Sequence, residues 1–353
     1  MRIFKQLSVI SYQLSAVLLI LVVGCHSSSP VPPLRISIVG DVLLARGVPA
    51  ALARDSAALR ATTRRLWAGS RYVIGNLECP LTDTARPAAK AIVFRGKPPW
   101  ASWLRSVGFT HVSLANNHTL DQHWPGLRAT ARAGRAARLG LLGYQPDSLV
   151  GCLPTVLGRD SSVAVFAYSA LRQGIAGEGC VCGRAFAALC ERVAAYKTLF
   201  PERAVLVYVH WGTEYAAQPS AGQRQQAHDL LDAGAAAVVG AHPHVVQPVE
   251  FYRGRPIVYS LGNFLFDQRG GETALAAQVD LTCGGAGWSL PISGRCAWQE
   301  PLRSARLPQP ARWCSSACAH SMPAPGLLAA GRRAGRPGPR RPPIRCPPTW
   351  CRT

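Results

Sequence analysis

Six short clusters of polar residues, each at the end of an apolar run, contain the residue types that bind metal ions. Their Asp, Glu, Asn and His side chains offer oxygen and nitrogen donors that suit divalent ions. Such a set, repeated along the chain, predicts a metal centre. In chain order the clusters are Gly40-Asp41, Gly75-Asn76-Leu77-Glu78, Ala115-Asn116-Asn117-His118, His210-Trp211-Gly212-Thr213-Glu214, Gly240-Ala241-His242-Pro243-His244 and Leu261-Gly262-Asn263-Phe264.

The apolar runs before the clusters are typical of buried strands, and the segments between them are typical of helices. This alternation predicts an α/β fold with largely parallel or mixed sheets, and a further pair of strands at 162–167 and 204–209 suggests a second sheet. Ligands bind beyond the carboxyl ends of strands in such folds. The predicted strands cover residues 36–39, 72–74, 112–114, 205–209, 236–239 and 257–259, and the predicted helices cover 50–67, 99–107, 125–138, 185–200 and 222–233.

Together and in this order, over residues 35–282, the six motifs resemble the capsule-synthesis CapA family of poly-γ-glutamate synthesis proteins. That family is similar to the calcineurin-like metallophosphoesterases. The resemblance implies a four-layer sandwich, in which two mixed sheets are flanked by helices and the metal lies at one edge. It also implies one or two divalent ions, which could be Mn, Fe, Zn or Mg.

The resemblance assigns roles to individual residues. His118 matches the acid that protonates the leaving oxygen, and Asp121 could orient its ring. His242 and His244 are two residues apart, so both rings can approach one centre from an extended segment. The matched metal ligands are Asp41, Glu78, Asn117, His210, His242 and His244; the residues expected to contact substrate or support the ligands are Arg46, Asn76, Asn116, Glu214 and Asn263.

Each residue also has a structural interpretation that involves no metal. Asp41 could cap a helix N-terminus, and Glu78 could be a solvated loop charge before Pro80. Residues 116–118 could form an Asn-rich turn with a surface His, and a lone His210 could be a core residue. Because the six clusters occur together in one chain, we favour the metal interpretation for each of these residues.

One position departs from the superfamily pattern. Calcineurin-like enzymes usually have Asp-x-His in the first motif, and the third position here is Leu43. A ligand of the first metal is therefore absent or replaced, which weakens the transfer of a full two-metal mechanism. An alternative source of charge for the substrate at that place is Arg46.

The N-terminal residues 1–25 are typical of a secretion signal, with Arg2 and Lys5 before the apolar stretch 16–23. Residues 21–25 resemble a bacterial lipobox, which implies lipidation of Cys25; the alternative is ordinary signal cleavage. Residues 26–34 read as a Ser/Pro-rich tether. We therefore expect a membrane-anchored lipoprotein outside the cytoplasm, on the cell surface or in the periplasm.

The C-terminal residues 283–353 are rich in Arg, Pro and Cys and contain one acidic residue, Glu300. This composition predicts disorder, because it cannot bury enough apolar area to offset chain entropy. Three interpretations stay open: a basic arm that binds polyanions, a disulfide-rich module, or an out-of-frame translation.

The formal net charge of the chain is +21, and roughly half of it lies in this C-terminal segment. No helix-turn-helix, finger or aromatic platform accompanies it, so we expect no nucleic-acid partner. The moderately basic body suits an anionic polymer or phosphoester substrate. Among the body cysteines, Cys180 or Cys182 could pair with Cys152 or Cys190, or all could be free thiols.

Two functions agree with these features. The first is a membrane-anchored, metal-dependent hydrolase of phosphoester or amide bonds in an anionic cell-surface substrate. The second is a non-catalytic component that binds or exports a polymer alongside membrane proteins of capsule synthesis. The density of candidate ligands favours the first, and Leu43 favours the second.

Overall fold

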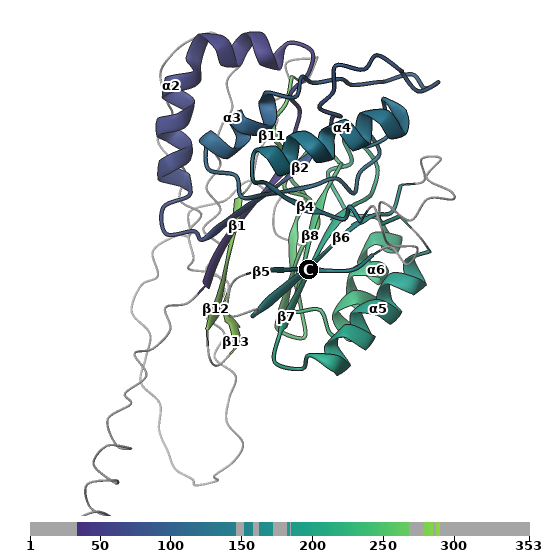
Figure 1. Ribbon diagram of the computed structural model, residues 1–353. Helices are drawn as coiled ribbons and strands as arrows, with labels where there is room; N and C mark the ends of the chain where they lie inside the picture. Colours follow the sequence, from purple (N-terminus) through teal and green to yellow (C-terminus); the bar gives the residue numbers. More distant parts are fainter. Residues whose placement is uncertain are drawn as a thin grey trace, which may run out of the picture. The chain divides into compact units, whose positions relative to one another are not determined.

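The computed structural model describes residues 34–145, 152–157, 162–171, 182–183, 185–267, 278–284 and 287–289. Two sheets lie at the centre of this part of the chain, with helices on their outer sides (Figure 1). The two sheets are described below, because their strand ends position the candidate site.

The first sheet has the order β13-β12-β1-β2-β3-β4, with β11 also paired to β1. Its strands β1 to β4 are parallel, whereas β12 pairs with β1 in the antiparallel direction. The sheet is therefore mixed. Its strands are β1 (Leu34–Val42), β2 (Tyr72–Leu77), β3 (His111–Ser113), β4 (Gly140–Leu142), β11 (Asn263–Leu265), β12 (Gln278–Gly284) and β13 (Gly287–Ser289).

The second sheet has the order β5-β6-β7-β8-β10-β9 and is also mixed, with parallel strands at its centre and antiparallel pairs at both edges. Strands β6 and β7 are apolar along their length and buried on both faces, as covered parallel strands must be. The strands are β5 (Thr155–Leu157), β6 (Val163–Ser169), β7 (Ala204–His210), β8 (Ala237–Ala241), β9 (Val249–Tyr252) and β10 (Arg255–Val258).

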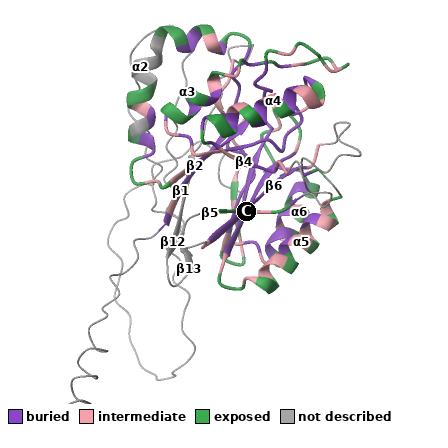
Figure 2. Ribbon diagram, viewed as in Figure 1, coloured by how far each residue is buried: buried purple, intermediate pink, exposed green. Residues whose placement is uncertain are grey.

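Helices cover the outer face of each sheet. Helices α2 (Val48–Leu66), α3 (Trp100–Ser106) and α4 (His123–Ala136) lie with the first sheet, and α5 (Phe186–Leu199) and α6 (Ala221–Asp232) with the second (Figure 1). Alternate residues of β6 and β7 enter two separate cores. One core lies between the sheets and under α2 to α4, and the other lies under α5 and α6 (Figure 2).

This arrangement confirms the predicted α/β class with two mixed sheets flanked by helices. Each predicted helix is present, with ends within two residues of the predicted ones. In the described part of the chain, no helix combines the length and apolar character needed to span a membrane.

Several sequence-based expectations concern residues outside the described ranges. These are the signal peptide, the lipidation of Cys25, the tether and most of the C-terminal segment. The sheet itself continues beyond residue 282, where we placed the end of the domain. Strand β12 runs to Gly284, and β13 pairs with it as far as Ser289.

A disulfide joins Cys152 to Cys182, which is one of the pairings that the sequence left open. Cys79 and Cys190 are free thiols, so the alternative pairing with Cys190 does not occur. Both bonded sulfurs lie in the core under α5 and α6. The bond ties the segment before β5 to the segment before α5.

Candidate metal centre

The first sheet places polar residues at the carboxyl ends of β1 and β2 and at the start of β11. Asp41 on β1 is in register with Asn76 on β2 and with Asn263 on β11. All three side chains are buried. The Asn76 amide donates to Asp41 Oδ1 at 2.8 Å, which fixes the carboxylate between the strands.

The second sheet delivers histidines to the same region. His210 ends β7 and is in register with Ala241, the last residue of β8. His242 therefore follows directly beside it, and the two rings lie 4.7 Å apart. The backbone N–H of His242 donates to Asp41 Oδ2 at 3.2 Å, so the two sheets meet at this point.

Two loops of the first sheet complete the cluster. Glu78 follows β2, and its backbone N–H donates to Val42 O at 2.9 Å, which places the carboxylate beside the end of β1. Asn117 follows β3, and its Oδ1 lies 2.9 Å from His210 Nε2. Asn116 supports this loop, since its amide donates to Asn76 Oδ1 and its Oδ1 accepts from the His118 backbone.

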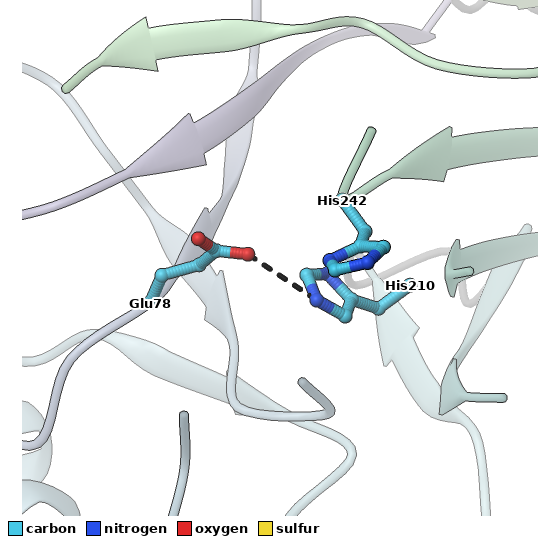
Figure 3. Close-up of side chains that lie close together, drawn as sticks. All are labelled: Glu78, His210 and His242. Carbon is cyan, nitrogen blue, oxygen red and sulfur yellow. Dashed lines mark ion pairs between the residues drawn. The ribbon is translucent and has the colours of Figure 1, made fainter. Parts of the chain in front are cut away.

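Glu78, His210 and His242 form a first group of donor atoms that all lie within 4.8 Å of one another (Figure 3). Glu78 Oε1 is 3.2 Å from His210 Nε2, and Asn117 Oδ1 reaches the same nitrogen. Two ligand atoms of a tetrahedral Zn²⁺ ion, each about 2.0–2.2 Å from the metal, are roughly 3.3–3.5 Å apart, so these spacings suit one bound ion.

Asp41, Glu78 and His244 form a second group within the same limit. His244 Nδ1 lies 3.2 Å from Asp41 Oδ2 and 2.8 Å from Asn263 Oδ1. Glu78 belongs to both groups. A carboxylate with two oxygens can serve two neighbouring ions, so the arrangement fits a pair of ions that share Glu78.

Two buried atoms of these groups have no hydrogen-bond partner. They are Glu78 Oε2 and His242 Nδ1. A buried carboxylate oxygen without a partner costs several kcal/mol, and a bound cation would remove that cost. The donor set of carboxylates, an amide and imidazoles also suits Zn²⁺, Mn²⁺ or Fe²⁺. The residues therefore fit a divalent metal centre.

Burial and the charges of neighbouring groups shift the pKa values of the candidate ligands. Burial, reinforced by Asp41, raises the pKa of Glu78 well above its usual range. Burial lowers the pKa of His210 well below normal and that of His242 to about 4. Burial would also lower the pKa of His244, but the carboxylates of Glu78 and Asp41 outweigh it and raise the value to about 10.

The predicted acid, His118, lies beside these groups in a hydrogen-bonded chain. Its Nδ1 is 2.8 Å from Asp121 Oδ2, as expected for a carboxylate that orients the ring. Burial lowers the pKa of His118, with Asp121 opposing the shift. The Phe94 ring packs at 4.2 Å from the imidazole, and the Phe94 N–H donates to the same carboxylate oxygen.

Sequence reasoning missed Lys90. Its ammonium forms an ion pair with Asp121 Oδ1, donates to the Asn117 carbonyl at 2.9 Å and lies 3.4 Å from His118 Nδ1. Lys90 therefore neutralises the buried Asp121 and supports two candidate site residues. No local signal marks it, because it sits in an Ala-rich loop far from its partners in sequence.

Arg46 is exposed. Its guanidinium pairs with Asp267, with Nε 2.8 Å from Oδ1, and stacks on Phe94 and Phe266. The positive charge that we expected to meet substrate is thus already paired. Glu214 is exposed, but its carboxylate lies within 4.8 Å of both His242 and His244.

The fold and this site define a class: layered α/β proteins with a buried carboxylate–histidine cluster that could hold metal ions. The family profile of the bacterial capsule synthesis protein PGA_cap matches residues 35–268. The chain belongs to this family, as the motif order predicted.

Curated relatives agree with this assignment. The PGA biosynthesis protein CapA of Bacillus subtilis is 31% identical over 70% of this chain and 67% of its own length. The capsule biosynthesis protein CapA of Bacillus anthracis is 31% identical over 70% of this chain and 63% of its own. A probable polyglutamine synthesis accessory protein of Mycobacterium tuberculosis is 30% identical, over 55% of each chain. The matches thus span about two thirds or less of these relatives.

Proposed function

We propose that this protein is a metal-dependent hydrolase of phosphoester or amide bonds in an anionic cell-surface substrate. The observation that carries the proposal is the pair of buried atoms without a hydrogen-bond partner, Glu78 Oε2 and His242 Nδ1, within two overlapping groups of donors. A buried cluster of this kind is costly to build without a cation. A proton-transfer group, His118, stands beside it with its orienting partners.

The residues that would hold the ions are Asp41, Glu78, Asn117, His210, His242 and His244. When bound, divalent ions polarise a phosphoryl or carbonyl oxygen and lower the pKa of a water molecule. The chain's own residues do the rest. Asn76 holds the carboxylates and His210 in place, since its amide lies 2.8 Å from Asp41, 3.2 Å from Glu78 and 3.1 Å from His210.

His118 is the proton donor to the leaving group. Asp121 accepts from Nδ1 of the ring, which leaves Nε2 to carry the proton that is transferred. Burial favours the neutral ring in the free chain, and an anionic substrate beside it would favour the charged, acidic form. Lys90 holds Asp121 from the opposite side, so the carboxylate keeps its orientation.

The substrate class follows from charge and from the names of relatives. Three relatives are named for PGA, capsule or polyglutamine synthesis. Residues 26–282 carry 26 basic and 17 acidic residues, and this moderate positive charge favours an anionic substrate. A γ-linked polyglutamate or a phosphoester polymer fits both observations. Trimming an anionic polymer by hydrolysis would place this activity within capsule synthesis.

The place of action that we propose is outside the cytoplasm. The N-terminal signal and the lipobox-like residues 21–25 support anchoring through a lipidated Cys25, beside membrane proteins of capsule synthesis. Wild type expressed in a bacterium should incorporate a labelled fatty acid, and Cys25→Ser should incorporate none. Equal labelling of the two proteins, or none in the wild type, would contradict lipidation of this residue.

The test of the hydrolase proposal compares His118→Ala with the full-length wild type on phosphodiesters of different leaving groups. Proton donation typically contributes about 10²–10⁴-fold, so the variant should lose that much turnover on an alkyl leaving group. The loss should shrink on a nitrophenolate, which needs little protonation. Metal content should stay unchanged.

His228→Ala serves as the control, because His228 is a surface histidine of α6 bonded to Glu250 at 2.6 Å. The His228→Ala variant should hydrolyse the same substrates at the wild-type rate. Equal rates of His118→Ala and wild type on the alkyl ester would remove His118 from the mechanism.

A non-catalytic polymer-binding or export component is the alternative. Leu43 offers no donor atom where related enzymes have His, and the relatives are named for synthesis rather than cleavage. Metal-loaded wild type that cleaves neither phosphodiesters nor polyglutamate, yet binds polyglutamate, would favour this alternative.

A further inference from the structure

The loop that follows β7 lies against the segment that carries His242 and His244. Trp211 N–H donates to Ala241 O at 3.1 Å, and Tyr215 N–H donates to Pro243 O at 2.7 Å. The Gln247 amide donates to Ala216 O at 2.8 Å. These three bonds fix the backbone on both sides of Glu214, so its side chain starts from a defined position.

The Glu214 carboxylate reaches the two histidines of that segment. One of its oxygens and one nitrogen each of His242 and His244 all lie within 4.8 Å of one another. Unlike the other candidate ligands, Glu214 is exposed. It therefore approaches the cluster from the solvent side. The charge of Glu214 also contributes to the raised pKa of the buried Glu78, behind desolvation and Asp41.

Each of the two groups has an amide oxygen beside its three donors. Asn117 Oδ1 lies 2.9 Å from His210 Nε2 in the group of Glu78, His210 and His242. Asn263 Oδ1 lies 2.8 Å from His244 Nδ1 in the group of Asp41, Glu78 and His244. Leu43 adds no donor, because its side chain packs in the core between the sheets. Divalent ions such as Mg²⁺ and Mn²⁺ take six ligands, so the second group leaves room for a further donor.

We propose that Glu214 is a metal ligand and adds a carboxylate donor to the ion at Asp41, Glu78 and His244. A carboxylate is a suitable ligand for each of the divalent ions considered. The unpartnered, buried His242 Nδ1 and Glu78 Oε2 point independently to cations at this place. The inference rests on the proposed function only in that the site holds divalent ions; it does not require that the protein cleave anything.

The test measures metal binding by the full-length chain after removal of metal with a chelator. Stoichiometry comes from elemental analysis, affinity from competition with a chelating dye, and ligand environment from the absorption of bound Co²⁺. We expect two ions per wild-type chain. Loss of a residue that only orients a metal ligand typically lowers metal affinity by about 10–100-fold. Glu214→Gln should therefore lower the affinity for one of the two ions by at least about that factor. Its Co²⁺ spectrum should change as well.

Glu214→His should restore much of the binding, because imidazole is also a ligand. Glu202→Gln is the matched control: Glu202 is an exposed acid paired with Arg203, and its variant should bind like wild type. Because Glu214 is exposed, melting temperatures of the four proteins should be equal when all are metal-free.

The Asp41→Asn variant identifies which ion Glu214 binds. If Asp41 and Glu214 hold the same ion, the double variant of Asp41→Asn and Glu214→Gln should lose no more ions than Asp41→Asn alone. The proposal is overturned if Glu214→Gln binds both ions with wild-type affinity, if the double variant loses both ions, or if the wild type binds none. Wild type that binds two ions but hydrolyses nothing would defeat the proposed function and leave Glu214 as a ligand.

Discussion

Asn76 has an unusual place among the residues of the site, because a single amide nitrogen contacts three candidate ligands. It lies 2.8 Å from Asp41, 3.2 Å from Glu78 and 3.1 Å from His210. Asn116 holds the amide oxygen at 3.0 Å, which orients the whole group. Asn76 therefore organises donors from both sheets without being a ligand itself.

Asn76→Ala should lower metal affinity by about 10–100-fold, as is typical when a group that orients ligands is removed. The measurement is chelator competition with the full-length chain. Gln225→Ala removes an exposed amide from α6 and is the control, since its partner Asp229 lies on the same helix. Unchanged affinity in Asn76→Ala would show that the ligands hold their positions without it.

Metal binding should strengthen as the pH rises. A ligand must lose its proton before it binds, and the pKa of His244 in the metal-free chain is about 10. Below that value the proton competes with the metal. Apparent affinity should therefore rise by up to about tenfold per pH unit between pH 6 and 8 for each displaced proton. Isothermal titration in several buffers checks this, and an affinity that is flat over that range would contradict the assignment of His244.

At the scale of elements, two glycines allow the strand ends to approach closely. A Cβ on Gly40 of β1 would lie 1.8 Å from the backbone oxygen of Gly262, and one on Gly240 of β8 would lie 2.0 Å from that of Tyr259. The segment 259–262 thus crosses directly beside both strand ends. This close contact brings Asn263 into register with Asp41.

Gly40→Ala and Gly240→Ala should each destabilise the fold by about 3 kcal/mol, because the contacting atoms are backbone and cannot turn away. Gly222→Ala is the control. Gly222 lies in α6 with only Ser220 Oγ at 3.8 Å, so alanine there should stabilise by about 0.5–1 kcal/mol. Urea unfolding measures all three, and a neutral Gly40→Ala would contradict the close approach.

The sequence predicted the helices and the central strands well, because apolar periodicity depends on neighbours along the chain. It placed Asp41 after a strand, whereas β1 continues through Val42. It could not find Lys90, whose role depends on contacts with Asn117 and Asp121, nearly thirty residues away. The choice of Cys182 over Cys180 as the partner of Cys152 likewise depends on tertiary position.

In the molecule as a whole, the candidate site depends on two sheets whose strand ends lie close together. The hydroxyl of Tyr208 on β7 donates to Val39 O on β1 at 2.6 Å, which ties the sheets beside the site. Motif order predicted which residues converge. It could not predict that Glu78 and Asp41 would share His244, or that Glu214 would reach the same place from an exposed loop.

Truncation at the C-terminus tests which residues the fold requires. Removal of residues after Ser289 should leave melting temperature and metal content unchanged. Removal of residues after Asp267 deletes β12, the antiparallel partner of β1, and should cost at least about 2 kcal/mol, or roughly 4–8 °C. Thermal unfolding of the two truncated proteins beside the full chain makes the comparison. A large loss on truncation after Ser289 would show that later residues complete the fold.

The most direct measurement of the central claim is hydrolysis by full-length protein that has been stripped of metal and then reloaded. Phosphodiester and polyglutamate substrates should both be tried, with Mn²⁺, Zn²⁺, Fe²⁺ and Mg²⁺. We expect the stripped protein to be inactive and reloading to restore turnover of at least one substrate. The His242→Ala, His244→Ala double variant should neither bind metal nor regain activity. Turnover that persists in the stripped protein and in the double variant would contradict a metal-dependent hydrolase at this site.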